Sequence, residues 1–142
     1  LEQDSSHLTM PLPGAVDLLT SLTPGMWTVC TSANPRLGAA RLRAAGLPVP
    51  AELVSSEDVE FGKPHPDPYV RGAQNLGLAP EQCIVFEDAA AGIQAGLAAG
   101  VAQVIGVTKV ALDTNVTIVV KNLEGVSYRD GALHIPASSR LR

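Results

Sequence analysis

The sequence has 142 residues, of which 46% are hydrophobic, so it is long and apolar enough for one ordinary globular domain. Its formal net charge is −4 and it has no cluster of Lys or Arg, which argues against a nucleic-acid or anionic-membrane partner, because both require a concentrated positive surface. The most apolar stretch, residues 92–107, is short and rich in Gly, so no membrane-spanning segment is predicted.

Helices and strands are predicted to alternate along the chain. In order, they are a helix over 14–22, a strand over 26–31, a helix over 35–45, a short strand over 53–55, a helix over 66–76, a strand over 83–87, a helix over 89–99, strands over 104–107 and 117–120, and a hairpin over 128–135. Pro near helix starts and Gly after helix ends support these boundaries. The strands are continuously apolar, as in sheets covered on both faces. The sequence therefore predicts one α/β domain over 1–142, with a doubly wound, Rossmann-like parallel sheet and a flexible tail over 136–142.

The cysteines and histidines show no spacing typical of a metal or catalytic site. Cys30 and Cys83 lie in separate apolar runs without C-x-x-C spacing, which favours buried free thiols in a reducing compartment. We therefore expect a cytoplasmic protein. His7, His65 and His134 are far apart in the sequence, and we expect them at surface or turn positions.

In an open parallel sheet, ligands bind outside the carboxyl ends of the strands, so the residues that follow each strand are the candidates. Thr31, Ser32, Ala33 and Asn34 follow the first strand and open the helix that begins at Pro35. Hydroxyl groups and free N–H groups at such a helix start form an anion site. The alternative is that Ser32 or Asn34 only caps the helix.

Lys63 follows the second predicted strand and lies between Gly62 and Pro64. A lysine with a stiff neighbour on one side is a fixed point charge that can neutralise a phosphoryl oxygen. The alternative is a solvated loop lysine beside prolines that merely begin the next helix.

Glu87 and Asp88 end the third predicted strand, and only small residues follow them. Charges at the end of a buried strand are costly unless a cation or strong donors compensate them, and Mg²⁺, which prefers carboxylate oxygens, is the natural partner. The alternative is an interaction with the positive end of the next helix. Together the three turns predict a pocket for phosphate and magnesium, although no Ser/His/Asp arrangement supplies an activated nucleophile.

The order TSAN, GKPHPDPY and VFEDAAAGIQAG resembles the second, third and fourth motifs of the haloacid dehalogenase superfamily. The likeness runs from about residue 13 to residue 122. It is greatest to the capped phosphatases that act on small sugar and polyol phosphates, such as 2-deoxyglucose-6-phosphatase and glycerol-3-phosphatase. The resemblance implies that Ser32 hydrogen-bonds the transferring phosphoryl group, with Thr31 and the amides of Ala33 and Asn34 beside it. It also implies that Lys63 pairs with the phosphoryl oxygens and with a nucleophilic carboxylate.

By the same resemblance, Asp88 binds Mg²⁺ directly and Glu87 binds it directly or through water. A Glu–Asp pair at this place favours a phosphatase or phosphomutase over the dehalogenases, which use no metal. The leading hypothesis is therefore Mg²⁺-dependent hydrolysis of small phosphate monoesters through an aspartyl-phosphate intermediate. A non-catalytic domain with relic motifs and a phosphomutase are the open alternatives.

The first motif of that superfamily, an Asp-x-Asp-Gly-Thr run that supplies the nucleophile, does not occur in the sequence. The cap domain expected before the second motif is also missing, and the first residue is Leu1 rather than Met. We therefore expect a fragment with an incomplete core that lacks its first, central strand, with residues 1–12 as a cap-to-core linker. Neighbours of a missing central strand would expose apolar edges. We expect the chain to be inactive alone and stable only with an N-terminal segment or a complementary chain.

Overall fold

The structure, a computed structural model, describes residues 12–142. Its elements are α2 (Ala15–Ser21), α3 (Pro35–Ala44), α4 (Asp67–Asn75), η2 (Pro80–Gln82), β1 (Ile84–Glu87), α5 (Ala90–Ala99), β2 (Gln103–Val107), η3 (Lys109–Asp113), β3 (Ile118–Val120), β4 (Ser127–Arg129), β5 (Ala132–His134) and η4 (Ala137–Ser139). Every predicted helix is present, with each end within one residue of the expected position. Within residues 12–142, no helix has the length and apolar character needed to cross a membrane. The expectations for His7, and for the linker over 1–12 apart from Leu12, lie outside the described residues.

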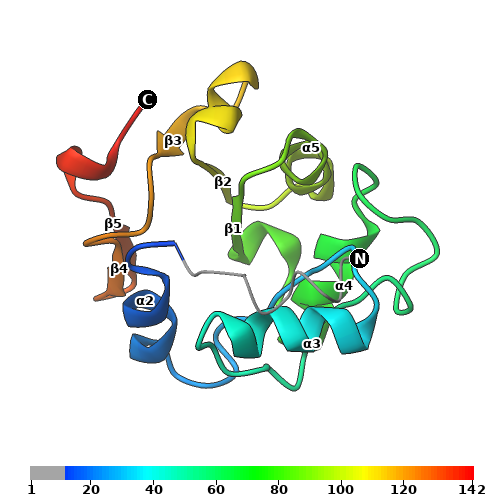
Figure 1. The fold of residues 1–142 in the computed structure, drawn as a ribbon. Coiled ribbons are helices and arrows are strands. Elements are labelled where there is room, and N and C mark those ends of the chain that lie inside the picture. Colours follow the sequence, from blue (N-terminus) through cyan, green and yellow to red (C-terminus); the bar gives the residue numbers. More distant parts are fainter. Residues whose placement is uncertain (1–11) are drawn as a thin grey trace.

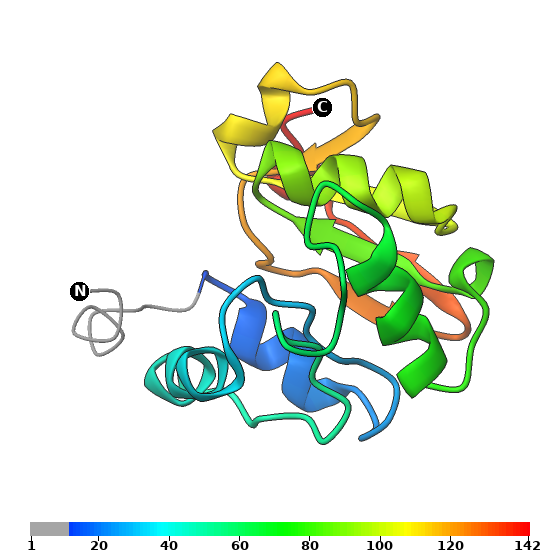
Figure 2. The ribbon, with the colours of Figure 1, turned by 90° about the vertical axis from the view of Figure 1, so that its right-hand side faces the viewer.

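Strands β1, β2 and β3 form a parallel sheet in that order (Figure 1). Alternate side chains enter two separate cores, as expected for a sheet covered on both faces. Val104 and Val119 pack with Ile93 of α5 on one face, where α4 and α5 lie in front of the sheet in Figure 2. Ile105 and Val120 pack with hairpin residues on the other face. The predicted α/β class with a parallel sheet is confirmed.

The strand predicted over residues 26–31 is reduced to one parallel bridge between Cys30 and Val54. The Thr31 N–H donates to the Val54 carbonyl, and the Val54 N–H donates to the Val29 carbonyl, both at 2.9 Å. Beyond the bridge the pairing becomes irregular: the Ser56 N–H donates to the Ala33 carbonyl at 2.9 Å, and the Ser55 N–H and hydroxyl both donate to the Asp58 carboxylate. A full strand needs a longer partner than this, so that prediction is wrong in extent. Within residues 12–142, strand pairing leaves the bridge separate from the β1–β3 sheet.

Two helix glycines allow close packing around the bridged segment. A Cβ at Gly38 of α3 would lie 2.9 Å from Cγ2 of Thr31, and one at Gly72 of α4 would lie 2.7 Å from Sγ of Cys30. Adjacent residues of an extended segment point to opposite faces. Helices α3 and α4 therefore cover the two sides of this segment and fix where its carboxyl end lies.

The hairpin occurs as predicted, with Asp130 and Gly131 both at positive φ in its two-residue turn. Residues 136–142, for which the sequence predicts a flexible tail, form hydrogen bonds with the rest of the domain. The Ser139 hydroxyl donates to the Glu124 carbonyl at 2.7 Å, and the Leu141 N–H donates to the Val119 carbonyl at 2.7 Å. The physical reason is the free edge of β3, whose backbone groups pair with this segment.

Candidate active site

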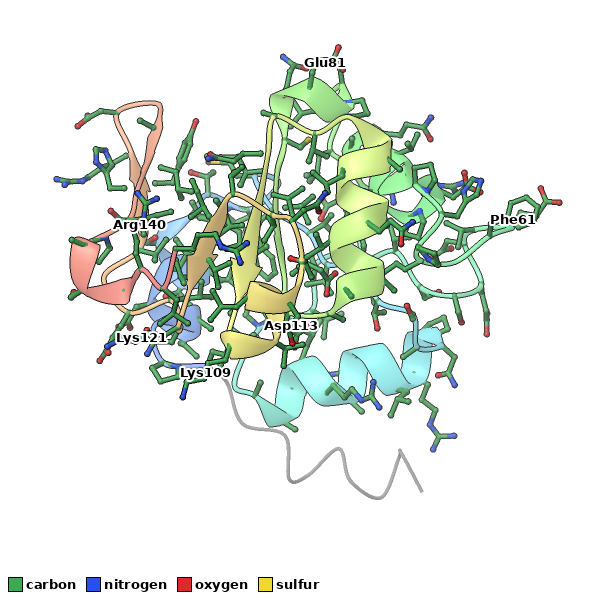
Figure 3. The ribbon with its side chains drawn as sticks, turned by 90° about the horizontal axis from the view of Figure 1, so that it is seen from above. Phe61, Glu81, Lys109, Asp113, Lys121 and Arg140 are labelled. Atoms are coloured by element: carbon green, nitrogen blue, oxygen red, sulfur yellow. The ribbon has the colours of Figure 1, made fainter. Side chains whose placement is uncertain are left out.

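The candidate residues gather at the carboxyl end of the parallel strands. Figure 3 marks this end by Lys109 and Asp113, which belong to the turn after β2, and the opposite end by Glu81, which precedes β1. The Thr31–Asn34 turn follows the bridged segment, and Glu87 and Asp88 close β1. Lys63 comes from the loop before α4 and reaches both places.

Lys63 connects the Cys30–Val54 bridge with strand β1 of the sheet. Its Nζ donates to the Cys30 carbonyl at 2.8 Å and to Oε2 of Glu87 at 2.9 Å. The side chains of Lys63 and Glu87 are only 14% and 10% exposed. Lys63 is thus a shielded cation with fixed partners, and the alternative of a solvated loop lysine is wrong.

The Glu87 carboxylate accepts hydrogen bonds on both oxygens. Oε2 accepts from Lys63 and from the Tyr69 hydroxyl, and Oε1 accepts from the N–H groups of Asp88 and Ala89 at 3.2 and 3.3 Å. Gly92 makes room for this group, because a Cβ there would overlap it. Burial opposes ionisation, but the charge of Lys63 and the hydrogen bonds outweigh it, so the pKa of Glu87 lies below its usual value. Glu87 is therefore a carboxylate held by the protein itself.

Tyr69, in the first turn of α4, is a site residue that sequence reasoning missed. Its hydroxyl donates to Oε2 of Glu87, and its ring centroid lies 5.1 Å from Nζ of Lys63. Burial, followed by the negative charge of Glu87, raises the pKa of Tyr69 far above its usual value. The sequence offered one signal, since Tyr69 closes the GKPHPDPY motif. A motif alone does not say which way the side chain points.

Asp88 is exposed at the end of β1. Partial burial of its carboxyl group, and then the charge of Glu87, raise the pKa of Asp88. A divalent cation would offset both effects, so Asp88 fits the expected magnesium ligand. Among residues 12–142, no group of three or more His, Cys, Asp or Glu side chains is placed to share a metal ion. Glu87 and Asp88 are the expected ligands among these residues, and the magnesium site stays a prediction.

The predicted anion-binding turn contains a helix cap and an exposed serine. Oδ1 of Asn34 accepts from the Leu37 N–H at 2.8 Å, which confirms Asn34 as the cap of α3. The Ala33 N–H donates to the Thr31 hydroxyl at 3.1 Å. Ser32 is exposed and lines a small hollow together with residues of the 56–62 loop. The phosphate-binding roles of these four residues stay predictions.

Cys30 is a partly buried thiol behind the site. Its Sγ donates to the Pro68 carbonyl at 3.2 Å, and burial raises its pKa to about 11. Cys30 and Cys83 are both free, as predicted, but both are only partly buried, whereas the sequence predicts buried thiols. His65 is exposed, with Nδ1 3.2 Å from Oδ1 of Asp67, and His134 lies in the hairpin. Neither histidine contacts Lys63 or Glu87 in the interactions described above.

Comparison with known proteins supports the resemblance seen in the motifs. The sequence profile of the haloacid dehalogenase-like hydrolases matches residues 3–100. Hexitol phosphatase A of Escherichia coli is 50% identical over 91 residues, which cover 63% of this chain and 42% of the relative. Glycerol-1-phosphate phosphohydrolase 2 of Saccharomyces cerevisiae is 36% identical over 133 residues, which cover 83% of this chain and 53% of the relative. The chain thus spans about half the length of the curated relatives that it matches.

Solved structures show the same fold. A conserved haloacid dehalogenase-like protein of Agrobacterium tumefaciens has a TM-score of 0.73 at 24% identity, covering 85% of this chain and 60% of that protein. A β-phosphoglucomutase from Clostridium difficile has a TM-score of 0.62 at 26% identity, covering 79% of this chain and 50% of that protein. Both likenesses confirm the fold of the chain and its partial coverage of longer relatives.

Proposed function

The chain belongs to the haloacid dehalogenase-like hydrolases, and on that premise we propose that the intact protein hydrolyses small sugar or polyol phosphate monoesters with the help of Mg²⁺. The observation that carries this proposal is Lys63, a shielded cation fixed at the carboxyl edge of the sheet by Cys30 and Glu87. The names of the relatives, a hexitol phosphatase and a glycerol-1-phosphate phosphohydrolase, support the substrate class. The two free cysteines suit a reducing compartment such as the cytoplasm.

Lys63 has the donor arrangement that a phosphate site requires. An ammonium group has three N–H donors, and two of them are directed at Cys30 and Glu87. The third is left for a phosphoryl oxygen. Phosphoryl transfer depends mainly on positioning and on stabilisation of charge. We assign the Ser32 hydroxyl, with Thr31 beside it, to the same phosphoryl group.

For the metal, we assign Asp88 as the direct carboxylate ligand from this chain. Glu87 already accepts four hydrogen bonds, so a contact through water suits it better than direct ligation. When bound, Mg²⁺ would neutralise negative charge on the phosphoryl oxygens. The Asp88 N–H donates to Oε1 of Glu87, and this turn would hold Asp88 in place.

The nucleophile has to come from outside this chain, because the sequence contains no Asp-x-Asp-Gly-Thr run. We propose that an N-terminal segment or a complementary chain supplies an aspartate beside Lys63. Its carboxylate would attack phosphorus while the ester P–O bond breaks, and the sugar or polyol would leave as an alcohol after taking a proton from the second aspartate of that motif. Water would then hydrolyse the aspartyl phosphate to inorganic phosphate and the free aspartate. The same segment would bring the strand that pairs with β1.

The test uses the whole protein that contains this chain, assayed with a panel of sugar and polyol phosphates with and without Mg²⁺. Lys63→Ala and Asp88→Asn are each expected to lower turnover by about 100-fold or more. Asp17→Asn, an exposed carboxyl change on α2, is the matched control and should leave turnover unchanged. Near-normal turnover in both site variants would remove these residues from the mechanism.

The same experiment separates the alternatives. Release of inorganic phosphate supports hydrolysis, whereas an isomeric sugar phosphate as product supports a phosphomutase. If the intact wild-type protein turns over no phosphate ester, the domain is non-catalytic and the proposal fails.

A further inference from the structure

We propose that Tyr69 is a positioning residue of this site, whose hydroxyl fixes the Glu87 carboxylate so that Glu87 in turn fixes the Lys63 ammonium. This inference rests on the proposed function, because it adds a residue to the same site. Tyr69 itself is not placed on the substrate. It acts through Glu87 and Lys63.

The geometry makes Glu87 the centre of a small network. Its Oε2 accepts from Lys63 at 2.9 Å and also from the Tyr69 hydroxyl. The terminal torsion of a glutamate has a broad energy profile, so a carboxylate held by one donor can rotate. Two donors on Oε2, with two backbone N–H groups on Oε1, remove that freedom. The oxygen that Lys63 binds is therefore held at one place.

Tyr69 contacts Lys63 in a second way. The face of its ring lies 5.1 Å from Nζ of Lys63, within the range of a cation–π attraction. The ring also packs against the core cluster around Val85 and Ile93. Tyr69 is thus anchored by apolar packing on one side and directs polar and aromatic contacts to the site on the other.

The packing and the hydroxyl have separable roles. A phenylalanine would keep the ring against the core and over Lys63, but it would leave Oε2 of Glu87 with Lys63 as its remaining donor. Lys63 would then be held by a carboxylate that is itself less fixed. Tyr69→Phe should therefore weaken stabilisation of the transition state more than substrate binding, because the transition state depends more strongly on the position of the Lys63 charge.

The test compares Tyr69→Phe with Tyr128→Phe in the whole protein that contains this chain. Tyr128 is 39% exposed in the hairpin, so it offers the same chemical change away from the site. Hydrolysis of p-nitrophenyl phosphate at saturating Mg²⁺ gives kcat and KM separately, and urea unfolding gives stability. For Tyr69→Phe we expect kcat to fall about tenfold, equivalent to about 1.4 kcal/mol in the barrier. KM and the urea midpoint should change little, and Tyr128→Phe should match the wild type.

A second readout does not depend on activity. Trace acetylation of the folded protein, with mass spectrometry of the peptides, measures how readily Lys63 reacts. We expect Lys63 to react several-fold faster in Tyr69→Phe than in the wild type or in Tyr128→Phe, because its ammonium is less firmly held. If the wild type hydrolyses no ester, the proposed function fails and this readout alone decides the positioning role.

Two results would overturn the inference. One is a Tyr69→Phe variant with wild-type kcat and wild-type reactivity of Lys63. The other is a loss of kcat that follows a loss of folded protein in the urea experiment, since that would assign Tyr69 to the core alone.

Discussion

Replacing Lys63 with methionine would leave the Glu87 carboxylate shielded from water without its cation. Removing one partner of a fully buried ion pair costs about 3–5 kcal/mol. Here the two side chains are 14% and 10% exposed, and Glu87 keeps three other donors. We therefore expect Lys63→Met to lower the free energy of unfolding by about 2–3 kcal/mol. Adding Glu87→Gln removes the unpaired charge and should restore part of that loss.

The assay is a double-mutant cycle by urea unfolding of the whole protein at pH 7. The coupling energy between the two positions is expected to be about 1–2 kcal/mol. The folded-state pKa of Glu87 is lowered, so the pair stabilises the protein above the unfolded pKa of about 4.3. That contribution is lost as the pH falls through the folded-state pKa. The stability gap between wild type and Lys63→Met should therefore narrow at low pH. The reasoning would be refuted if the two substitutions were additive within about 0.5 kcal/mol and if the difference in unfolding free energy between wild type and Lys63→Met did not change with pH.

Three further predictions concern the frame around the site. The 142-residue chain alone is expected to lack a cooperative urea transition and to gain one with the N-terminal segment or complementary chain; a soluble monomer with a sharp transition would contradict this. Ser139→Ala, which loses a buried hydrogen bond, should cost about 1–2 kcal/mol by urea unfolding, whereas the exposed neighbour Ser138→Ala should change stability by less than about 0.5 kcal/mol. Gly92→Ala would push a Cβ into the Glu87 carboxyl group and should cost about 1–3 kcal/mol, while Gly62→Ala, with open space around it, should cost clearly less.

The helices could be predicted from the sequence because their ends are set locally. Pro35 begins α3 and Gly100 ends α5 with a left-handed residue, so both boundaries follow from neighbouring residues. The strand expected over 26–31 could not be judged in this way. Its ladder depends on a partner around Val54, and regular pairing stops after Val54, where the Ser56 N–H donates to the Ala33 carbonyl. Strand pairing depends on residues that are distant in the sequence, so an apolar run alone does not predict it.

The site was predictable in outline for a similar reason. The order of strands places Ser32, Lys63 and Asp88 at one edge, which follows from parallel topology alone. Whether Lys63 is a solvated loop residue or a fixed cation depends on contacts 33 and 24 residues away along the chain, with Cys30 and Glu87. Sequence reasoning left both readings open, and the contacts decide between them. Tyr69 was not predicted as a site residue, because its role depends on a hydrogen bond to Glu87, which lies 18 positions later in the sequence.

The contact between Lys63 and Cys30 has a consequence for the assembled protein. In the bridge to Val54, the Thr31 N–H and the Val29 carbonyl face Val54, so the Cys30 carbonyl faces the opposite edge, along which no strand pairs among residues 12–142. A strand placed along that edge would offer its own N–H groups to such a carbonyl. Lys63 occupies that acceptor here, at 2.8 Å. A carbonyl oxygen accepts up to two hydrogen bonds, so a further strand can pair with Cys30 while Lys63 keeps its contacts with Cys30 and Glu87. The added strand would then lie directly beside the Lys63 ammonium, where the proposed nucleophile is needed.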